Sequence, residues 1–420
     1  MRGREEFWRR ALSATPTKLP VGRNTMLLAA GMAALYGMVQ LWAAVTPSTF
    51  EAVTGLKGLV GLGPAIFMST AALAALPAGR TMDRFGRIPV LAGGFVLGIL
   101  GCVLAGLGAS LLSVTVVVFG LILIGASYAT VMLSRAAAAD MYPPERRARG
   151  VALVLFGAVF GALLGPFVFI PLSAQQGTQG GQLMAPWLAA AGFMAVGLVL
   201  IVNVRPDPKR IGALLAERSS EGIVRSARRA DPLVQILRRP GVMAALLAAV
   251  ASFSVMASMM TLVGYVLVGH GHHQGAVFPV LSAHFIGMFG LMPIVGNIID
   301  RLGRLRALLG GLVLIGFCSL SIVWVVDSIT ATSLALFGIG LGWNFSYVAA
   351  TAELADRTVP VERGKILGFT DLLAGLLSAL LVSLGGLTLR AVGLAGLGVA
   401  GLALTIAPTL WILRGVSKHT

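Results

Sequence analysis

Long apolar runs recur along the chain and are separated by short polar or turn-rich breaks. A helix needs about 20 mostly apolar residues to cross the hydrocarbon core of a bilayer. Twelve runs reach about that length. The pattern therefore predicts an all-α membrane protein with twelve transmembrane helices. Their expected ranges are 25–46, 58–79, 89–108, 112–138, 151–172, 185–203, 241–268, 277–298, 307–326, 331–354, 366–388 and 392–413.

The longest internal polar stretch, residues 204–240, divides these helices six and six. It contains nine basic and four acidic residues. Residues 211–229 within it are expected either to form an amphipathic helix at the membrane surface or to belong to a solvated linker. The predicted organisation is a tail at 1–24, a six-helix bundle at 25–203, the linker at 204–240, a second six-helix bundle at 241–413 and a tail at 414–420.

Composition and charge place these helices in a membrane with a defined orientation. Hydrophobic residues make up 57% of the chain and charged residues 11%, whereas an average soluble domain has about 25% charged residues. If both termini are cytoplasmic, every Lys and Arg falls on the cytoplasmic side except Lys57 and Arg390. Because the net charge of +16 is spread over all those loops, we expect no nucleic-acid partner. No cleavable signal peptide is visible in residues 1–24.

A short polar sequence occurs twice, once in each predicted half. The copies follow the second and eighth predicted helices at a constant offset of 217 residues. A second pair, Asp140 and Asp356, follows the fourth and tenth helices at an offset of 216. Such self-similarity indicates two pseudo-symmetric bundles. The first copy contains Gly79, Asp83, Arg84, Gly86 and Arg87, and the second contains Gly296, Asp300, Arg301, Gly303 and Arg304.

These copies resemble the G-x-x-x-D-R-x-G-R loop signature of the major facilitator superfamily of secondary transporters. The resemblance covers the whole chain, including the helix count and the six-linker-six layout. It implies two six-helix halves built from inverted three-helix repeats, with a substrate site between them near the bilayer midplane. It also implies a non-enzymatic, cofactor-free monomer in a bacterial cytoplasmic (inner) membrane.

The resemblance further implies a latch at the cytoplasmic edge. Gly79 would permit close helix contact, and Gly86 and Gly303 would permit sharp turns. Asp83 would lie near the start of the eleventh helix, where an anion is favoured. In the family, such contacts hold the cytoplasmic side closed; the alternative is that the charges only fix topology and turns. Arg84 or Arg87 would pair with Asp140, Asp300 would face the start of the fifth helix, and Arg301 or Arg304 would pair with Asp356.

The fifth predicted helix carries Gly157, Gly161 and Gly165 at every fourth position, followed by Pro166. This spacing resembles part of the antiporter signature of drug:proton exchangers. That signature continues to a Gly-Gly pair, and this chain has Phe169 and Ile170 there. The alternative is ordinary close packing with a proline bend.

Three ionisable residues within the predicted helices are candidates for proton coupling. Asp371 lies about two turns into the eleventh helix, so its carboxyl is the first candidate for proton uptake and release. The alternative pairs it with Arg363 or Lys365. His284 can titrate near neutral pH or can hydrogen-bond to a neighbouring helix. Glu353, three residues before Asp356, fits a gate network better than a midplane site.

Polar and aromatic residues on the first, fourth, seventh and tenth helices are expected to line the central cavity. Arg135 near the end of the fourth helix either faces this cavity or reaches toward the headgroups and the latch. Such a lining favours a lipophilic or amphiphilic solute over a sugar phosphate or a nucleotide. The other candidates are Tyr36, Gln40, Tyr128, Ser258, Tyr265, Trp343, Asn344 and Tyr347.

The leading functional hypothesis is therefore proton-coupled efflux of a hydrophobic or amphipathic compound. The alternatives are a metabolite importer or facilitator, a lipid transporter and an intramembrane enzyme. The enzyme is disfavoured because the sequence has no zinc-helix, nucleophile-elbow or P-loop motif. We expect no metal site, because the histidines at 270–273 lack a fourth ligand and a fixed geometry. Cys102 and Cys318 lie in apolar runs, so no disulfide is expected.

Overall fold

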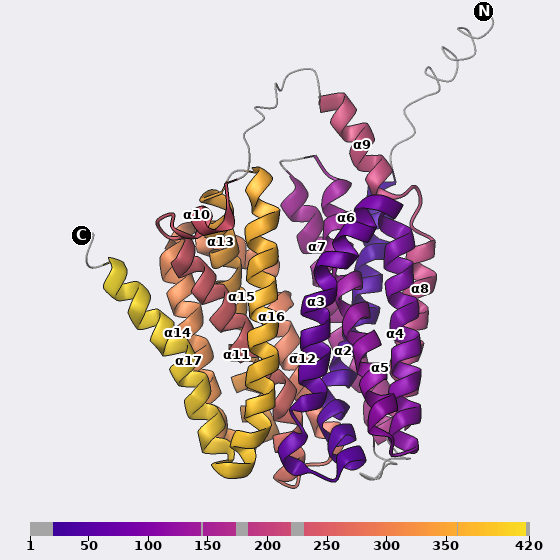
Figure 1. Cartoon of the computed structure of the whole chain (residues 1–420), viewed down its shortest axis with the longest axis vertical. Helices are drawn as coiled ribbons and strands as arrows, with labels where there is room; N and C mark the ends of the chain where they lie inside the picture. Colours follow the sequence, from indigo (N-terminus) through magenta and orange to yellow (C-terminus); the bar gives the residue numbers. More distant parts are fainter. Residues whose placement is uncertain (1–19, 144–145, 174–183, 220–230, 359, 417–420) are drawn as a thin grey trace, which may run out of the picture.

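A computed structural model describes residues 20–143, 146–173, 184–219, 231–358 and 360–416. Every regular element in these ranges is helical, and the helices run side by side as one elongated bundle (Figure 1). Within these described ranges, ten helices are long and apolar enough to cross a membrane. The helix α7 and the segment from α12 to α13 occupy the other two predicted crossings, so the architecture is consistent with twelve.

The N-terminal half contains six predicted crossings, the fourth of them broken in two. The short helix η1 (Lys57–Leu59) precedes α3. The predicted fourth helix is interrupted at Leu133, between α5 and α6. The helices are α2 (Val21–Thr54), α3 (Leu62–Phe85), α4 (Arg87–Ser110), α5 (Val114–Met132), α6 (Ser134–Asp140), α7 (Arg147–Ser173) and α8 (Met184–Val202).

The C-terminal half follows the same plan, with an interruption in its second crossing. There the π-helical turn η5 (Ile286–Gly290) separates α12 (Val277–Phe285) from α13 (Met292–Leu302). The short helix η4 (Gln274–Ala276) precedes α12. The remaining helices are α11 (Val242–Gly269), α14 (Arg304–Val325), α15 (Ile329–Asp356), α16 (Pro360–Ala391) and α17 (Gly393–Val416).

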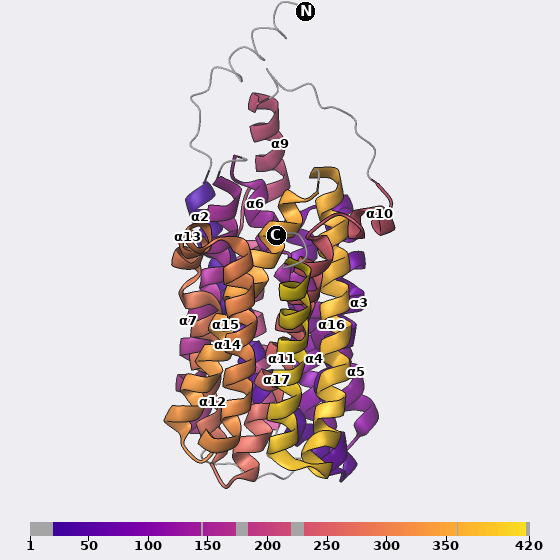
Figure 2. The ribbon, with the colours of Figure 1, turned by 90° about the vertical axis from the view of Figure 1, so that its left-hand side faces the viewer.

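The same helix pairs pack in both halves, which shows the pseudo-symmetry. In the N-terminal half α2 packs on α7, and α4 packs on α5 and α8. In the C-terminal half α11 packs on α16, and α14 packs on α15 and α17. The halves meet where α3 packs on α16 and α7 packs on α12, and Figure 2 shows the C-terminal half from its outer side.

The structure corrects one predicted helix end and bears on the linker. The first helix was expected to end at residue 46, but α2 continues through Pro47 to Thr54. For residues 211–229, where either an amphipathic helix or a solvated linker was expected, the structure has α9 (Pro208–Ser219), and residues 220–229 lie outside the described residues. Figures 1 and 2 show α9 rising away from the bundle. It packs on α4 and α6 and points away from the end of the bundle, whereas an interfacial helix would lie across that end.

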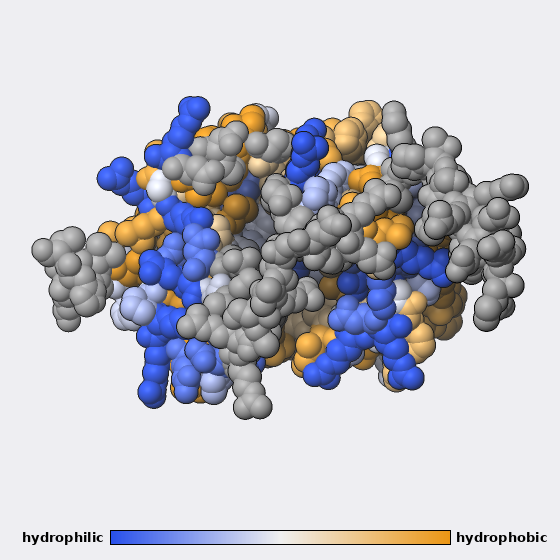
Figure 3. All heavy atoms as spheres, turned by 90° about the horizontal axis from the view of Figure 1, so that it is seen from above, coloured by the Kyte–Doolittle hydropathy of each residue, from blue (hydrophilic) through white to orange (hydrophobic). Residues whose placement is uncertain are grey.

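The repeated loops lie at one end of the bundle, which we call the basic end; we call the other the opposite end. The turns between α3 and α4 and between α13 and α14 are at the basic end. Gly86 has φ 101° and Gly303 has φ 82°, a left-handed conformation that favours glycine. Hydrophilic side chains gather over both halves when the molecule is viewed onto this end (Figure 3). The linker helices α9 and α10 (Leu233–Leu237) are also here.

Candidate functional site

An ion pair joins the two halves deep in the bundle. Arg135 of α6 donates a hydrogen bond to the Asp371 carboxylate of α16 at 3.3 Å. The hydroxyl of Tyr347 in α15 donates to the other oxygen of Asp371 at 2.5 Å. The side chains of Arg135 and Asp371 are 39% and 38% exposed, although both belong to helices at the interface between the halves. The pair is therefore only partly buried.

Aromatic side chains from both halves pack on one another in a series beside this pair, and within it Tyr36, Phe289 and Trp343 are buried, whereas Tyr347 is half-buried. Trp343 stacks on Tyr347 with ring centroids 5.1 Å apart. Phe289 lies 5.9 Å from Trp343, and Tyr36 of α2 meets Phe289 edge-on at 4.9 Å. Edge-to-face and stacked rings are the favoured aromatic arrangements. The series extends to Phe253, which lies 6.1 Å from Tyr347.

A second aromatic series lies within the N-terminal half. Tyr128 of α5 is half-buried and lies 5.4 Å from Phe67 of α3. Phe67 in turn stacks on Trp42 of α2 at 3.9 Å. The phenylalanines in both series were not among the sequence-predicted residues, because a phenylalanine in an apolar run looks the same whether it faces lipid or a cavity.

Gln40 does not line an open cavity, contrary to the prediction. Its side chain is fully buried and donates to the Ser282 hydroxyl at 2.7 Å and to the Phe278 carbonyl at 3.1 Å. The Ser282 hydroxyl in turn donates a hydrogen bond to the Ala162 carbonyl of α7 at 2.6 Å. These bonds join the halves, because α2 and α7 belong to one half and α12 to the other.

Glycines bring the halves into backbone contact at the opposite end. A Cβ added to Gly61, at the start of α3, would overlap the Val382 carbonyl of α16. A Cβ on Gly386 would lie 3.0 Å from the Gly61 nitrogen and 3.2 Å from the Gly58 oxygen. Nearby, Gln274 donates to the Ala44 carbonyl of α2 at 2.9 Å. The opposite end is therefore closed.

The repeated charges form contacts within each half at the basic end. Arg87 donates to Asp140 at 2.7 Å and to Asp83 at 2.8 Å. Arg304 contacts Asp356 and donates to the Ala352 carbonyl at 3.0 Å. Both arrangements match the predicted arginine partners. Arg84 lies over the Phe85 ring at 5.2 Å, Arg301 is exposed, and the side chain of Asp300 lies outside the described residues.

Neither the predicted position of Asp83 near the start of α16 nor the predicted close helix contact of Gly79 is formed in this conformation. The Asp83 side chain is 75% exposed, so its carboxylate is not buried against α16. A Cβ on Gly79 would meet no atom within 4 Å. The ion pair of Arg135 with Asp371 joins the two halves, whereas the pairs of Arg87 and of Arg304 stay within one half. Among the described residues, Gly79 and Asp83 thus leave the basic end without the latch contacts.

The other proton-coupling candidates lie in protein contacts. His284 is fully buried, and its Nδ1 is 2.8 Å from the Leu336 carbonyl of α15, which is the geometry of the helix-bonding alternative. Glu353 accepts from Arg357 at 2.8 Å and lies 3.9 Å from Arg304. It is thus part of the charge network of the basic end.

The remaining cavity candidates are mostly buried. Ser258 donates to the Ser254 carbonyl of its own helix. Tyr265 interacts with the Glu51 side chain of α2. Asn344 is fully buried, and its side-chain atoms have no hydrogen-bond partner among the described atoms. Of the predicted set, the half-buried residues around the central opening are Tyr128, Arg135 and Tyr347.

The glycines of α7 pack closely on α2. A Cβ on Gly157 would overlap the Ala29 carbonyl, and one on Gly161 would overlap the Ala33 carbonyl. This is the close helix packing that the sequence offered as an alternative to an antiporter signature. The surroundings of Gly165 and of the Pro166 side chain are outside what the structure describes.

Two carboxylates that the sequence did not single out brace the basic end. Asp207 Oδ2 accepts from the backbone nitrogens of Arg87 and Ile88, both at 3.0 Å, and so caps α4 from the linker. Glu362 of α16 is 1% exposed and accepts from the Arg239 guanidinium at 2.7 and 2.9 Å. These hydrogen bonds raise the pKa of Arg239, first through Glu362 and then through Asp231. Asp207 thus attaches the start of the linker to the N-terminal half, and Arg239 attaches its end to the C-terminal half.

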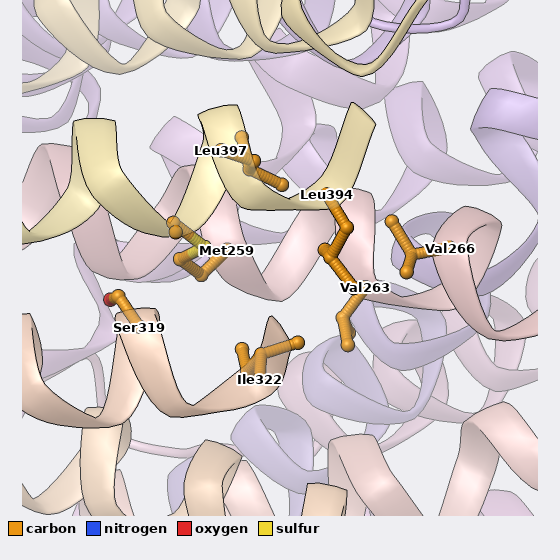
Figure 4. Close-up of a pocket in the computed structure, with 8 residues that line it drawn as sticks. Met259, Val263, Val266, Ser319, Ile322, Leu394 and Leu397 are labelled. Carbon is orange, nitrogen blue, oxygen red and sulfur yellow. The ribbon is translucent and has the colours of Figure 1, made fainter. Parts of the chain in front are cut away.

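A void of about 10 Å³ lies inside the C-terminal half, between α11, α14 and α17 (Figure 4). Met259, Val263, Ile322 and Leu397 line it, with Ser319 at one edge. That volume suits about one water molecule, so it is too small for a transported solute. No group of three or more His, Cys, Asp or Glu side chains that could hold a metal ion occurs among the described residues.

Two pseudo-symmetric helical halves, joined at one end by backbone contacts and further in by an ion pair, are the architecture of a membrane transporter. The chain belongs to the Major Facilitator Superfamily, whose sequence profile matches residues 24–383.

Relatives and solved structures agree with this assignment. The chain is 28% identical over 400 residues to the uncharacterised MFS-type transporter YddS of Bacillus subtilis, covering 91% of this chain and 90% of that one. It is 28% identical to the riboflavin transporter RfnT of Brucella anthropi, covering 80% and 83%. The structure of the xylose transporter XylE from E. coli superimposes with a TM-score of 0.70 at 14% identity, covering 94% and 99%. At that identity the likeness shows the fold alone.

Proposed function

We propose that the chain is a proton-coupled secondary transporter that exports a hydrophobic or amphipathic small molecule. The observation that carries this proposal is the cluster of Arg135, Asp371 and Tyr347. It links the two halves, it is accessible to solvent, and it adjoins aromatic rings from both halves. A charge pair across a moving interface responds directly to protonation, because a neutral carboxyl attracts a guanidinium far less than a carboxylate does.

The orientation of the cycle follows from the positive-inside distribution of Lys and Arg. We place the basic end in the cytoplasm of a bacterial cell and the chain, as a monomer, in its cytoplasmic membrane. The conformation then opens inward. In the outward-open state, the basic end would close by bringing Gly79 and Asp83 against α16, and the opposite end would part between Gly61 and Val382.

Proton exchange at Asp371 would couple to this movement. When Asp371 is ionised, its bonds to Arg135 and Tyr347 connect α16 and α15 with α6. Protonation removes the negative charge and weakens the bond to Arg135, so that the halves can separate there. Glu353 and His284 are secondary candidates, since both have partners within the C-terminal half.

The half-buried aromatic rings beside the ion pair favour a flat, largely apolar solute with a polar edge. Tyr128 and Tyr347 are partly exposed and can offer ring faces or edges for stacking, while Arg135 and Asp371 supply polar groups next to them. Because one relative is a riboflavin transporter, transport of a flavin-like heterocycle is the second candidate function.

The test uses purified full-length protein in proteoliposomes with an imposed pH gradient. A thermal-shift panel of lipophilic amines, lipophilic anions and riboflavin first selects ligands, because a ligand that binds the folded state raises its melting temperature. Proton-linked flux of the best ligand is then compared between wild type and Asp371→Asn. Asp327→Asn is the matched control, since Asp327 is 86% exposed and pairs with His270 at the opposite end.

We expect Asp371→Asn to abolish pH-driven flux while still binding the ligand, and Asp327→Asn to resemble wild type. Full pH-driven flux in Asp371→Asn would remove that residue from proton coupling. A riboflavin response with no response to lipophilic amines or anions would favour the flavin-like candidate.

A further inference from the structure

A groove lies on the outer side of the N-terminal half at the basic end, away from the interface with the other half. Its volume is about 820 Å³. The end of α3, the start of α4, the end of α8 and the start of α9 enclose it; α4, α8 and α9 are at the right of Figure 1. Its apolar wall includes Ile88, Ala92 and Val202.

Four basic side chains line the groove: Arg84, Arg205, Lys209 and Arg210. None of the described carboxylates lies within ion-pair distance of these four cations. The one acidic lining residue, Asp207, uses its Oδ2 to accept from two backbone nitrogens of α4, and its Oδ1 accepts from the Lys209 nitrogen at 2.8 Å. The groove therefore presents excess positive charge.

The fold fixes the position of the basic residues next to Asp207 at the start of the linker. Asp207 attaches the linker to the first turn of α4, and the Lys209 ammonium donates to the Asp83 carbonyl at the end of α3. The basic residues on either side of Asp207 are thereby held above the apolar wall. A preorganised cluster of this kind loses less conformational entropy on binding than free side chains on a loop do.

The groove continues into a lipid-facing apolar surface. Along α4, Val96 is 42% and Leu100 is 51% exposed, and Val199 of α8 is 61% exposed. These side chains lie further along the same helices toward the membrane interior. A molecule with an anionic head and apolar tails would thus find its charge partners in the groove and its apolar partners directly below.

We propose that this groove binds the headgroup of an anionic phospholipid from the surrounding bilayer, with the acyl chains along α4 and α8. Clusters of Lys and Arg at the membrane surface attract anionic lipids. This inference goes beyond the proposed transport cycle, because the groove lies outside the central site and does not require a transported substrate. The bound lipid would hold the start of the linker, and with it the cap of α4, against the membrane edge.

The experiment is native mass spectrometry of the full-length protein purified in detergent, with phosphatidylglycerol or phosphatidylcholine added. The test variant is Arg205→Gln/Arg210→Gln. The matched control is Arg238→Gln/Arg306→Gln, which removes the same charge from exposed arginines of the other half at the same end. We expect phosphatidylglycerol affinity to fall roughly 10- to 30-fold in the test variant, because each basic residue near the surface contributes about fivefold. The control should keep the wild-type affinity.

Equal retention of phosphatidylglycerol by the two variants would overturn the proposal, as would equal retention of both lipids by wild type. Displacement of the lipid by millimolar inorganic phosphate would assign the groove to a free anion instead. Arg210→Gln alone, measured by the rise in melting temperature with phosphatidylglycerol over phosphatidylcholine, provides a second readout. A rise as large as in wild type would also count against the site.

Discussion

The two ends of the interface between the halves are held in different ways. At the opposite end, contacts run between the halves: Gly61 meets the Val382 carbonyl, and Gln40 bonds to Ser282. At the basic end they run within each half, as in the pair of Arg87 with Asp140. The difference suggests where a mutation should act. Changes at the opposite end should shift the balance between conformations, whereas changes at the basic end should first affect the stability of one half.

The largest effect is expected for Gly61→Val. The added side chain would overlap backbone atoms of α16, which cannot rotate away, so closing the opposite end should cost about 3 kcal/mol or more. The population of the inward-open state should fall at least 100-fold, and transport should fall with it. Labelling of single cysteines placed at each end would measure the shift.

Gly79→Val is the matched control in the same helix. Nothing lies within 4 Å of its Cβ position in this structure, so the inward-open state should remain intact. If Gly79 contacts α16 when the basic end closes, the substitution should trap the protein inward-open, a shift of opposite sign. The same shift in both variants would contradict the assignment of the two ends.

The next effect is expected for Glu362→Gln. This substitution removes the charge partner of Arg239 from a buried position, and we expect unfolding free energy to fall by about 2–3 kcal/mol. A lower melting temperature with unchanged cysteine accessibility at both ends is the predicted result. A large change in accessibility instead would mean that the pair also governs opening.

Gln40→Leu should have a smaller effect, in the same direction as Gly61→Val. It removes the hydrogen bonds to Ser282 and Phe278 without adding bulk, so closure of the opposite end should weaken by about 1–2 kcal/mol. Labelling at that end should rise. Ser258→Ala is the control, since Ser258 bonds only to its own helix and should leave labelling unchanged.

The smallest effect in this state is expected for Asp83→Asn. The exposed pair with Arg87 is worth only about 0.3–0.5 kcal/mol, so the melting temperature of the inward-open protein should hardly change. The latch proposal still expects the variant to favour the inward-open state. Unaltered accessibility at the basic end would therefore count against the latch.

The sequence was sufficient to predict the fold but only part of the site. Apolar length and the repeated loop gave the helices and their two-fold arrangement, because both signals are local. The pairing of Arg135 with Asp371 joins residues 236 positions apart, and no local pattern encodes it. The sequence did contain one hint, since these are among the few charges inside predicted helices and they carry opposite signs.

Other failures have their own physical causes. Gln40 was expected in an open cavity because polarity alone does not separate a lining residue from one that bonds two helices together. The predicted contacts of Gly79 and Asp83 are not formed in the conformation seen here, and we propose that they form when the basic end closes. The cap of α4 by Asp207 was missed because sequence rules place a capping residue next to its own helix.

That cap has a consequence for how the protein is made. The first turn of α4 depends on a carboxylate that leaves the ribosome about 120 residues later. During synthesis, α4 therefore enters the membrane with its leading amide groups still unsatisfied by protein, and the N-terminal half matures only after the chain has passed α8. A fragment intended to assemble alone should accordingly extend past Asp207, into α9, instead of stopping at the last membrane crossing.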